Sequence, residues 1–342
     1  MKALVIGATG FIGVNLVDAL IAEGIDVRAA RRKRSPTILL ARRTVEFVPA
    51  SIEEPRAMRE AMDGCDAVFY AAGYYPRYSL DRESAIEQGV SQVRAVCEAA
   101  MDVGVKKLVY TSSVGSLARV KGRAANEDDR EARAPTDSVY RAVKWSMERA
   151  LEASIERGLD AVTLMPGGCV GEYDARAGTG GILLAVASSA LPWWVDGTVN
   201  LVDVRDVALA HVRALSAPRG ARYCLGGHDV RMRSLLAMIA ERYGGSSGAI
   251  ELTAEQARAR ADEEERVAAA NNKRVAFARE LVDLVTLGQP VDDARAVREL
   301  GMTFGPLEAA LDRAHRWYSR CGYLKTIPTN QPDSLQREGA SR

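Results

Sequence analysis

The sequence has almost no net charge and no long hydrophobic run. Its 342 residues contain 46 Lys and Arg against 45 Asp and Glu, so the formal net charge is +1. Such a balance argues against a protein that binds nucleic acid through its phosphates. No apolar stretch reaches the roughly 18 residues of a membrane span, since the nearest, residues 182–195, contains two serines and a proline. We therefore expect a globular protein with no nucleic-acid partner and no membrane span.

Cysteine and histidine are also scarce. The five cysteines form no CxxC pair, and neither they nor the three histidines have the spacing of metal ligands. The N-terminal apolar run contains glycines at fixed spacing and leads into an amphipathic helix, which does not suit a signal peptide. We therefore expect a cytoplasmic protein with reduced thiols and no metal site.

Strand patterns alternate with helical patterns through the first half of the chain. The strand patterns KALVIG, DAVFYAAG and KKLVYTSS are separated by helical patterns near residues 12–23, 84–103 and 138–157. Further on, Asp206 is expected to be the N-cap of a helix near residues 206–215. The alternation predicts an α/β fold, a doubly wound parallel sheet (Rossmann) with helices on both faces.

Three glycines follow the first strand at the start of the first helix. They are Gly7, Gly10 and Gly13 in GATGFIG. Without side chains, the backbone can turn tightly and approach a pyrophosphate at the positive end of the helix. A tight turn without a ligand is the alternative interpretation. The residues expected to contact a dinucleotide at this edge are Gly7, Thr9, Gly10, Phe11, Ile12, Gly13, Ala71 and Ala72.

A basic run, VRAARRKRSP, ends the second strand and holds five cations between Arg28 and Arg34. In sheets of this kind an acidic residue at that place accepts hydrogen bonds from the adenosine ribose, whereas an Arg accommodates a 2′-phosphate. Here the place holds Arg31, followed by Arg32. We expect both to bind the 2′-phosphate, which makes the cofactor NADP(H); a solvated cationic loop is the alternative.

The segment YRAVK places Tyr140 and Lys144 four residues apart in a helical pattern. This spacing puts both side chains on one helix face, where the ammonium is expected to lower the pKa of the phenol. Such a tyrosine can transfer a proton near neutral pH. Ser112 and Ser113 end the preceding strand, and a hydroxyl there can hold a substrate oxygen against Tyr140.

The motifs GATGFIG, YTSS and YxxxK occur in the order found in a known family. Together with NLVDVRDVALAH and YCLGG, the sequence resembles the extended short-chain dehydrogenase/reductases, the NAD-dependent epimerase/dehydratase group. It is most similar to the dihydroflavonol reductase-like and hopanoid-associated sugar epimerase branch, over roughly residues 1–324. The resemblance implies that Ser113, Tyr140 and Lys144 are the catalytic triad, that Lys144 also holds the nicotinamide ribose, and that Pro166 lies beside the nicotinamide.

Three positions depart from the family pattern. Ser51 stands where an Asp usually lies near the adenine. Gly89 replaces a helix Asn, which puts a proton relay through that Asn in doubt. Gly168 replaces an Asn that is common in sugar-nucleotide epimerases, and this weakens the sugar-nucleotide interpretation.

The resemblance, with the pattern along the chain, also suggests a division into domains. We expect residues 1–168 to form an NADP-binding Rossmann domain, to which a strand or helix near residues 198–215 returns. Residues 169–325 are expected to form a smaller mixed α/β domain that binds the substrate. Residues 253–274 are charged all round and predict a solvated helix, and residues 326–342 predict a disordered tail.

The loop after the fourth strand, YYPRYSLD, carries three tyrosines, Tyr74, Tyr75 and Tyr78. Clustered tyrosines there would suit an aromatic or apolar substrate, although they could instead pack the loop onto the sheet. Gly168 and Trp193 are candidates for the other side of the substrate site, although core packing is the favoured interpretation of Trp193.

The favoured hypothesis is an NADP(H)-dependent reductase or dehydrogenase that acts on a small organic carbonyl or alcohol. Tyr140 would exchange the proton, and Ser113 would orient the carbonyl. An NDP-sugar epimerase or dehydratase that recycles its cofactor is the alternative. A non-catalytic NADP-sensing regulator is a third hypothesis, which the intact Ser, Tyr and Lys set disfavours. A homodimer is one assembly that we consider.

Overall fold

The central layer of the protein is a parallel β-sheet of seven strands. The computed structural model describes residues 1–76, 78–246, 250–273, 275 and 278–324. Within them the sheet has the order β10-β6-β5-β4-β1-β2-β3, and neighbouring strands are parallel. Its strands are β1 (Lys2–Ile6), β2 (Asp26–Arg31), β3 (Glu46–Pro49), β4 (Ala67–Tyr70), β5 (Lys107–Thr111), β6 (Ala161–Pro166) and β10 (Arg222–Leu225). The predicted doubly wound sheet is confirmed, whereas the predicted tail lies outside the described residues.

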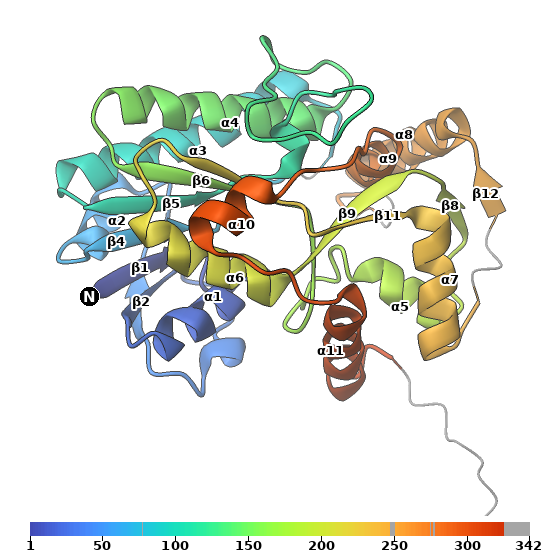
Figure 1. Ribbon diagram of the computed structural model, residues 1–342, viewed down its shortest axis with the longest axis horizontal. Helices are drawn as coiled ribbons and strands as arrows, with labels where there is room; N and C mark the ends of the chain where they lie inside the picture. The colour runs from blue at the N-terminus through green and yellow to red at the C-terminus, as the bar shows by residue number, and fades with distance from the viewer. Residues whose placement is uncertain (77, 247–249, 274, 276–277, 325–342) are drawn as a thin grey trace, which may run out of the picture.

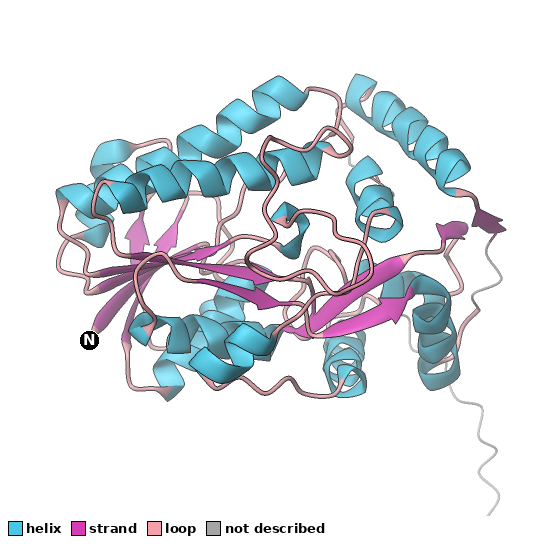
Figure 2. Cartoon of the chain, turned by 45° about the horizontal axis from the view of Figure 1, so that its top comes forward, coloured by secondary structure: helices cyan, strands magenta, loops and turns pink. Residues whose placement is uncertain are grey.

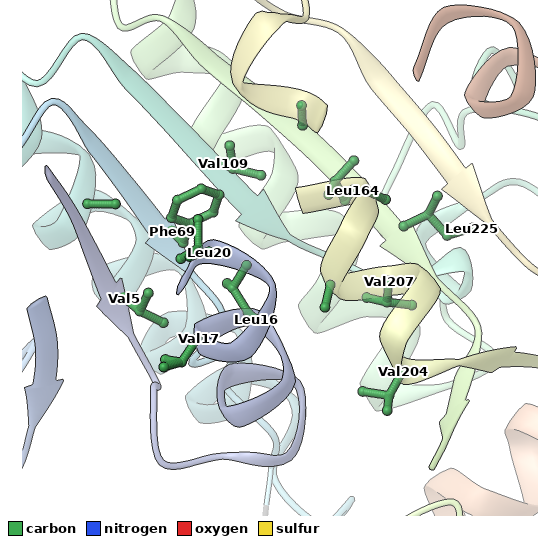
Figure 3. Close-up of a cluster of buried hydrophobic side chains, with 14 of the residues drawn as sticks. Val5, Leu16, Val17, Leu20, Phe69, Val109, Leu164, Val204, Val207 and Leu225 are labelled. Carbon is green, nitrogen blue, oxygen red and sulfur yellow. The ribbon is translucent and has the colours of Figure 1, made fainter. Parts of the chain in front are cut away.

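Helices cover both faces of this sheet, as Figures 1 and 2 show. One face carries α1 (Phe11–Ala22), α6 (Val204–Arg213) and α10 (Ala294–Leu300), and the other carries α2 (Pro55–Met62), α3 (Arg82–Asp102) and α4 (Val139–Glu156). The central strand β4 is buried along its whole length, as expected for a strand covered on both faces. Figure 3 shows Leu16 and Leu20 of α1 near Phe69 of the sheet, and Val207 of α6 on the side of Leu164 and Leu225 of the same cluster. None of the described helices is long and apolar enough to cross a bilayer.

The strand order reverses between β1 and β4. From β1 the chain adds β2 and β3 on one side, and then returns to place β4 on the other side of β1. Loops that leave strands on opposite sides of such a point diverge, and ligands bind in the resulting crevice at the carboxyl ends. In this protein that point lies between the turn that follows Ile6 and the segment that follows Tyr70.

The central layer extends beyond the residues that we expected to form it. β10 lies after residue 168 and is an edge strand of the sheet beside β6. From the region near 198–215, α6 packs against α1, but β9 (Thr198–Asp203) belongs to a different sheet. The boundaries at 1–168 and 169–325 therefore remain predictions, with β10 and α6 shared with the first part.

A smaller mixed layer stands beside the central one, at the right of Figure 1. β7 (Gly168–Val170), β9 and β11 (His228–Arg231) form a three-stranded sheet in the order β11-β9-β7, and β8 (Trp193–Val195) pairs with β12 (Ile250–Leu252). The helices of this layer are α5 (Gly181–Ala187), α7 (Met232–Tyr243), α8 (Ala254–Ala270), α9 (Arg279–Thr286) and α11 (Leu307–Arg320). Short 3-10 turns complete the chain at η1 (Ile38–Leu40), η2 (Val114–Ser116) and η3 (Ala214–Ser216).

Two local expectations were wrong. The helix predicted from residues 253–274 is not solvated all round, because α8 buries Ala257, Ala261 and Glu265. Asp206 is not the N-cap of α6: that cap is Asp203, whose carboxylate accepts the N–H of Arg205 at 3.0 Å. Asp206 instead accepts the N–H of Gly305 at 2.8 Å, a partner that only the tertiary fold supplies.

Candidate active site

The turn between β1 and α1 requires glycine at two of the three predicted positions. Gly7 has a φ of +95°, and a Cβ there would lie 2.8 Å from the backbone nitrogen of Ala72. A Cβ on Gly13 would lie 2.0 Å from the carbonyl oxygen of Gly7. Gly10 is the N-cap of α1 and is exposed, so that the amino end of the helix is open to a ligand. This is the tight, side-chain-free approach that a pyrophosphate needs.

The other residues expected around the dinucleotide gather at the same edge of the sheet. The N–H of Ala71 donates to the carbonyl of Ile6 at 2.9 Å, which holds the end of β4 against the end of β1. Ala71, Ala72 and Thr9 are partly exposed there. Phe11 and Ile12, at the start of α1, are also partly buried. The residues present therefore fit a dinucleotide whose pyrophosphate lies at the start of α1.

The basic run divides into two parts with different surroundings. Arg28 is engaged in structure, since its guanidinium donates to the carbonyl oxygens of Ala61 and Asp63 at 2.9 and 2.8 Å and pairs with Glu46. Arg31 is the last residue of β2 and Arg32 follows it at the carboxyl edge of the sheet. Neither forms an ion pair or a side-chain hydrogen bond with another described residue. Two unpaired guanidinium groups at this edge fit a 2′-phosphate.

Tyr140 and Lys144 lie on the buried face of α4, as their spacing predicted. Both are 2% exposed. The ammonium nitrogen of Lys144 lies 5.6 Å from the ring centre of Tyr140 and against the backbone of Gly73, where a Cβ would approach it to 2.8 Å. Ser138 begins the helix by accepting the N–H of Arg141. The helix register therefore presents the phenol and the ammonium together at the end of the sheet.

Ser113 meets Tyr140 from the end of β5. Its hydroxyl oxygen accepts the N–H of Gly115 at 3.1 Å, which leaves the hydroxyl proton available to a ligand. A Cβ on Gly115 would touch both the Tyr140 ring and the Ser113 hydroxyl, at 3.1 and 3.4 Å. The glycine therefore lets serine and tyrosine approach one another.

The neighbouring hydroxyls of Thr111 and Ser112 are engaged elsewhere. Ser112 donates to Glu148, which is paired with the buried Arg222 at 2.6 Å. Thr111 contacts Nε2 of His211 at 2.7 Å, while Nδ1 of this ring lies 2.7 Å from a carbonyl oxygen and therefore carries the proton. Burial lowers the pKa of His211 to about 4, so the ring is neutral and accepts from Thr111. Of these three hydroxyls, the geometry leaves Ser113 to a substrate.

The pKa of Tyr140 is raised, whereas the sequence led us to expect that it is lowered. Burial raises the pKa of Tyr140 well above its ordinary value, and nearby Glu280 raises it further, whereas the Ser113 and Tyr75 hydroxyls lower it. Burial also lowers the pKa of Lys144 to about 8, against the opposing effect of Glu280. Desolvation thus outweighs the attraction between cation and phenolate that we expected to dominate. At neutral pH Tyr140 is a neutral phenol, which is a proton donor.

Tyr75 contacts both Tyr140 and Lys144 directly. Its hydroxyl lies 3.0 Å from the hydroxyl of Tyr140, and its ring centre lies 4.8 Å from the ammonium nitrogen of Lys144. The two tyrosine rings are 5.1 Å apart. Tyr75 is nevertheless 57% exposed, because it belongs to the loop that follows β4. Its hydroxyl therefore marks a position where an oxygen can contact Tyr140.

The remaining substrate candidates are not all brought to this position. Tyr74 packs against the core on the α3 and α4 face, and Tyr78 donates to the carbonyl of Lys273 at 2.7 Å, which ties the loop to the end of α8. Trp193 is 2% exposed in a cluster with α8 and α9, so core packing rather than substrate contact accounts for it.

Pro166 and Gly168 follow the neighbouring strand. Pro166 ends β6 and is buried, and Gly168 begins β7, where a Cβ would lie 3.0 Å from the methyl group of Thr179. Since β6 is the neighbour of β5, both lie at the carboxyl edge that carries Ser113. Gly89 lies in α3, where a Cβ would meet Met147 of α4 at 3.1 Å, so the glycine serves the packing of the two helices. Among the described residues no group of three His, Cys, Asp or Glu side chains could hold a metal ion.

Sequence patterns did not reveal Glu280. It lies in the first turn of α9, is 9% exposed, and acts on the pKa of both Tyr140 and Lys144. Burial raises the pKa of its carboxyl to about 8. In the sequence it is one acid in an amphipathic stretch, and no motif distinguishes it from the surface acids of α8.

Comparisons with known proteins identify the family and the fold. The sequence profile of the NAD dependent epimerase/dehydratase family matches residues 3–226. A protein of Synechocystis sp. that carries the provisional name dihydroflavonol 4-reductase is 30% identical over 331 residues, which are 94% of this chain and 96% of that protein. Sterol demethylase protein B of Methylococcus capsulatus is 28% identical, over 95% of this chain and all of that protein. The crystal structure of a nucleoside-diphosphate-sugar epimerase from Pseudomonas aeruginosa superposes with a TM-score of 0.79 at 25% identity, over 95% of this chain and 99% of that one.

Proposed function

The chain belongs to the NAD dependent epimerase/dehydratase family, and we propose that it is an NADP(H)-dependent reductase or dehydrogenase that interconverts a carbonyl and an alcohol on a small organic substrate. The observation that carries this proposal is the buried, neutral phenol of Tyr140 beside the hydroxyl of Ser113. A neutral phenol gives a proton to a carbonyl oxygen as that oxygen gains charge.

The cofactor side of the proposal rests on the glycine turn and on two arginines. The pyrophosphate would lie at the amino end of α1, over Gly10. Arg31 and Arg32 would hold the 2′-phosphate that distinguishes NADP(H) from NAD(H). Lys144 would hold the nicotinamide ribose. When bound, the nicotinamide supplies the hydride for carbonyl reduction or accepts it in the reverse direction.

The chain's own residues do the rest of the chemistry. The Ser113 hydroxyl donates a hydrogen bond to the substrate carbonyl oxygen and fixes its position. Tyr140 donates its proton to the same oxygen, and the Lys144 ammonium stabilises the phenolate that remains. The Tyr75 hydroxyl occupies the place beside Tyr140 that this oxygen needs, so the Tyr75 loop has to yield when a substrate enters. An aromatic substrate would suit a site bordered by this exposed ring.

A second candidate is an NDP-sugar epimerase or dehydratase that recycles its cofactor in place. The similarity to a nucleoside-diphosphate-sugar epimerase favours it. Gly168 weighs against it, because sugar-nucleotide epimerases commonly have an Asn there.

The test is to incubate the purified protein with NADPH and a panel of ketones, aldehydes, quinones and flavonoid-like carbonyl compounds. We expect one molecule of alcohol for each NADPH consumed with at least one compound. A parallel panel of nucleoside-diphosphate sugars serves as the comparison. An epimerised or dehydrated sugar nucleotide formed without net NADPH consumption would support the second candidate and contradict the first.

A further inference from the structure

Arg141 is a buried arginine that stands between Tyr140 and Lys144 in the sequence, and the proposed reaction does not use its charge. The residue is 6% exposed. A charged group is removed from water in this way only where other groups satisfy it. Each of the three nitrogen atoms of its guanidinium donates to another part of the chain. The partners therefore show what this arginine serves.

Two of the donors hold the η2 turn against α4. Nε of Arg141 donates to the carbonyl oxygen of Gly115 at 3.2 Å, and Nη2 donates to the carbonyl oxygen of Leu117 at 2.9 Å. Gly115 is the middle residue of η2, and Leu117 is its C-cap. A single 3-10 turn leaves its last carbonyls without partners inside the turn, so it depends on donors from elsewhere. Arg141 supplies them from the helix that carries the catalytic tyrosine.

The same turn carries the Ser113 hydroxyl. Ser113 is the N-cap of η2, and its hydroxyl oxygen accepts the N–H of Gly115 at 3.1 Å. Gly115 also lies against the Tyr140 ring, where a Cβ would approach to 3.1 Å. One residue is thus bonded to Arg141 through its carbonyl and to Ser113 through its N–H. If the turn moves away from α4, the serine hydroxyl moves away from the phenol.

Two acids fix the direction in which the guanidinium points. Both carboxylate oxygens of Asp137 accept from Nη1 of Arg141, at 2.6 and 2.5 Å, and Glu131 lies 3.3 Å from Nη2. Both acids belong to the segment between η2 and α4. A guanidinium presents its donors at fixed angles in one plane, whereas a lysine ammonium is a single point charge. The bond to Asp137 therefore directs the other two nitrogen atoms of the guanidinium at the turn.

We propose that Arg141 is a positioning residue, which sets the place of the Ser113 hydroxyl beside the Tyr140 phenol by holding the η2 turn on α4. It touches neither substrate nor cofactor, because its donors are used within the chain. The inference rests on the proposed function, in which Ser113 and Tyr140 act on one carbonyl oxygen. The competing explanation is that Arg141 only stabilises the segment that contains Asp137 and Glu131.

Hydrogen exchange measures the hold on the turn without any substrate. Arg141→Met keeps an unbranched buried side chain and removes every donor. We expect the amide of Gly115 to exchange about tenfold faster in this variant, the effect of about one hydrogen bond. Amides in the second half of α4 should keep their parental rates. Arg157→Met, at the exposed end of α4, is the matched control and should leave the Gly115 amide unchanged.

A double-mutant cycle then separates positioning from stability. Turnover per folded molecule is measured with NADPH and the compound of the carbonyl panel that the parent reduces fastest. Arg141→Met and Ser113→Ala should each lower kcat about tenfold, and the double variant should be no slower than Ser113→Ala, because Arg141 acts through Ser113. Arg141→Lys should recover part of kcat. It also replaces Arg141→Met in both measurements if the methionine variant does not fold, with the same changes at reduced size.

Two results would overturn the inference. One is parental exchange at Gly115 in a folded variant without the guanidinium. The other is a parental kcat in that variant, or a loss that multiplies with the loss in Ser113→Ala, which would make Arg141 a structural residue only. Faster exchange at Gly115 in a protein that reduces no compound of the panel would leave the hold of Arg141 on the turn standing and contradict the proposed reductase.

Discussion

The carboxyl edge of the central sheet is built differently from the cover above it, by which we mean the loop that follows β4 together with α8 and α9. The two meet where the Tyr75 ring of the loop contacts Lys144. The edge is held by backbone geometry over short distances along the chain, as when Gly13 packs on Gly7 and Ser113 accepts the N–H of Gly115. The cover is held by side chains from distant segments. Glu265 joins two segments that are 186 and 14 residues away from it in the sequence. We infer that the edge sets the chemistry and the cofactor, while the cover sets the substrate.

Removal of the phenolic hydroxyl at the edge should have the largest effect. Tyr140→Phe should lower turnover by about 10²–10⁴-fold, because a positioned proton donor contributes about that much. NADPH affinity should stay within a few-fold of the parent, since the phenol holds little of the cofactor. Steady-state kinetics and a fluorescence titration measure the two quantities. Tyr323→Phe, far from the sheet edge, should leave both unchanged, and near-parental turnover of Tyr140→Phe would remove Tyr140 from the mechanism.

Substitution of Glu280 in the cover should instead change how the free energy of unfolding depends on pH. The folded state raises the pKa of Glu280 from 4.5 to about 8, so the folded protein binds more protons than the unfolded one in this range. Its free energy of unfolding then falls as the pH rises, by at most about 4–5 kcal/mol from this group. Glu280→Gln removes the titration and should gain stability over the parent progressively between pH 5 and about 8. Denaturant unfolding at several pH values measures this, and parallel curves for the two proteins would show that Glu280 is not desolvated.

The cofactor end of the edge can be tested by charge reversal. Arg31→Asp should repel the 2′-phosphate and offer an acceptor to free ribose hydroxyls, so the preference for NADPH over NADH should fall by one to two decades, or about 1.5–3 kcal/mol. Arg34→Ala, further along the loop, should change it little. Titration of both cofactors with each variant measures the preference. If Arg31→Asp still preferred NADPH as strongly as the parent does, the basic run would be an ordinary solvated loop without a role in cofactor binding.

The smallest effects are expected for alanine substitutions of two adjacent serines, which should differ in kind. Ser113→Ala should lower turnover about tenfold through the loss of one hydrogen bond to the carbonyl oxygen, with stability nearly unchanged. Ser112→Ala should keep turnover per folded molecule and lose about 1–3 kcal/mol of stability, because Glu148 loses a buried partner. Steady-state kinetics and thermal unfolding measure the two quantities for both variants. The reverse pattern would show that Ser112 contacts the substrate and that Ser113 is structural.

The sequence supports prediction of the edge far better than of the cover, for a physical reason. Gly7, Tyr140 and Lys144 work through local turns and helix spacing, which short patterns encode. The choice of Ser113 over Ser112 depends on Glu148 and Arg222, and the neutral phenol of Tyr140 depends on burial, which spacing does not report.

The failures in the cover are all failures to foresee packing between distant segments. α8 looks solvated in sequence because its buried positions are alanines and the acid Glu265, whose partners lie in two other segments. Trp193 packs in the core with α8 and α9, as the favoured interpretation of the sequence expected, but the sequence did not indicate these partners. Glu280 acts on the pKa of Lys144 only because of the tertiary packing of α9, so no sequence pattern identifies it.

A crystal structure of the complex with NADP⁺ is the most direct test of the central claim that the sheet edge holds this cofactor and presents it to Tyr140. We expect the pyrophosphate against the amino end of α1 at Gly10, the 2′-phosphate within hydrogen-bond distance of Arg31 or Arg32, and the nicotinamide ribose at the Lys144 ammonium. A dinucleotide bound in this way with its 2′-phosphate in solvent would contradict the cofactor preference. A dinucleotide bound away from Tyr140 and Ser113 would contradict the account as a whole.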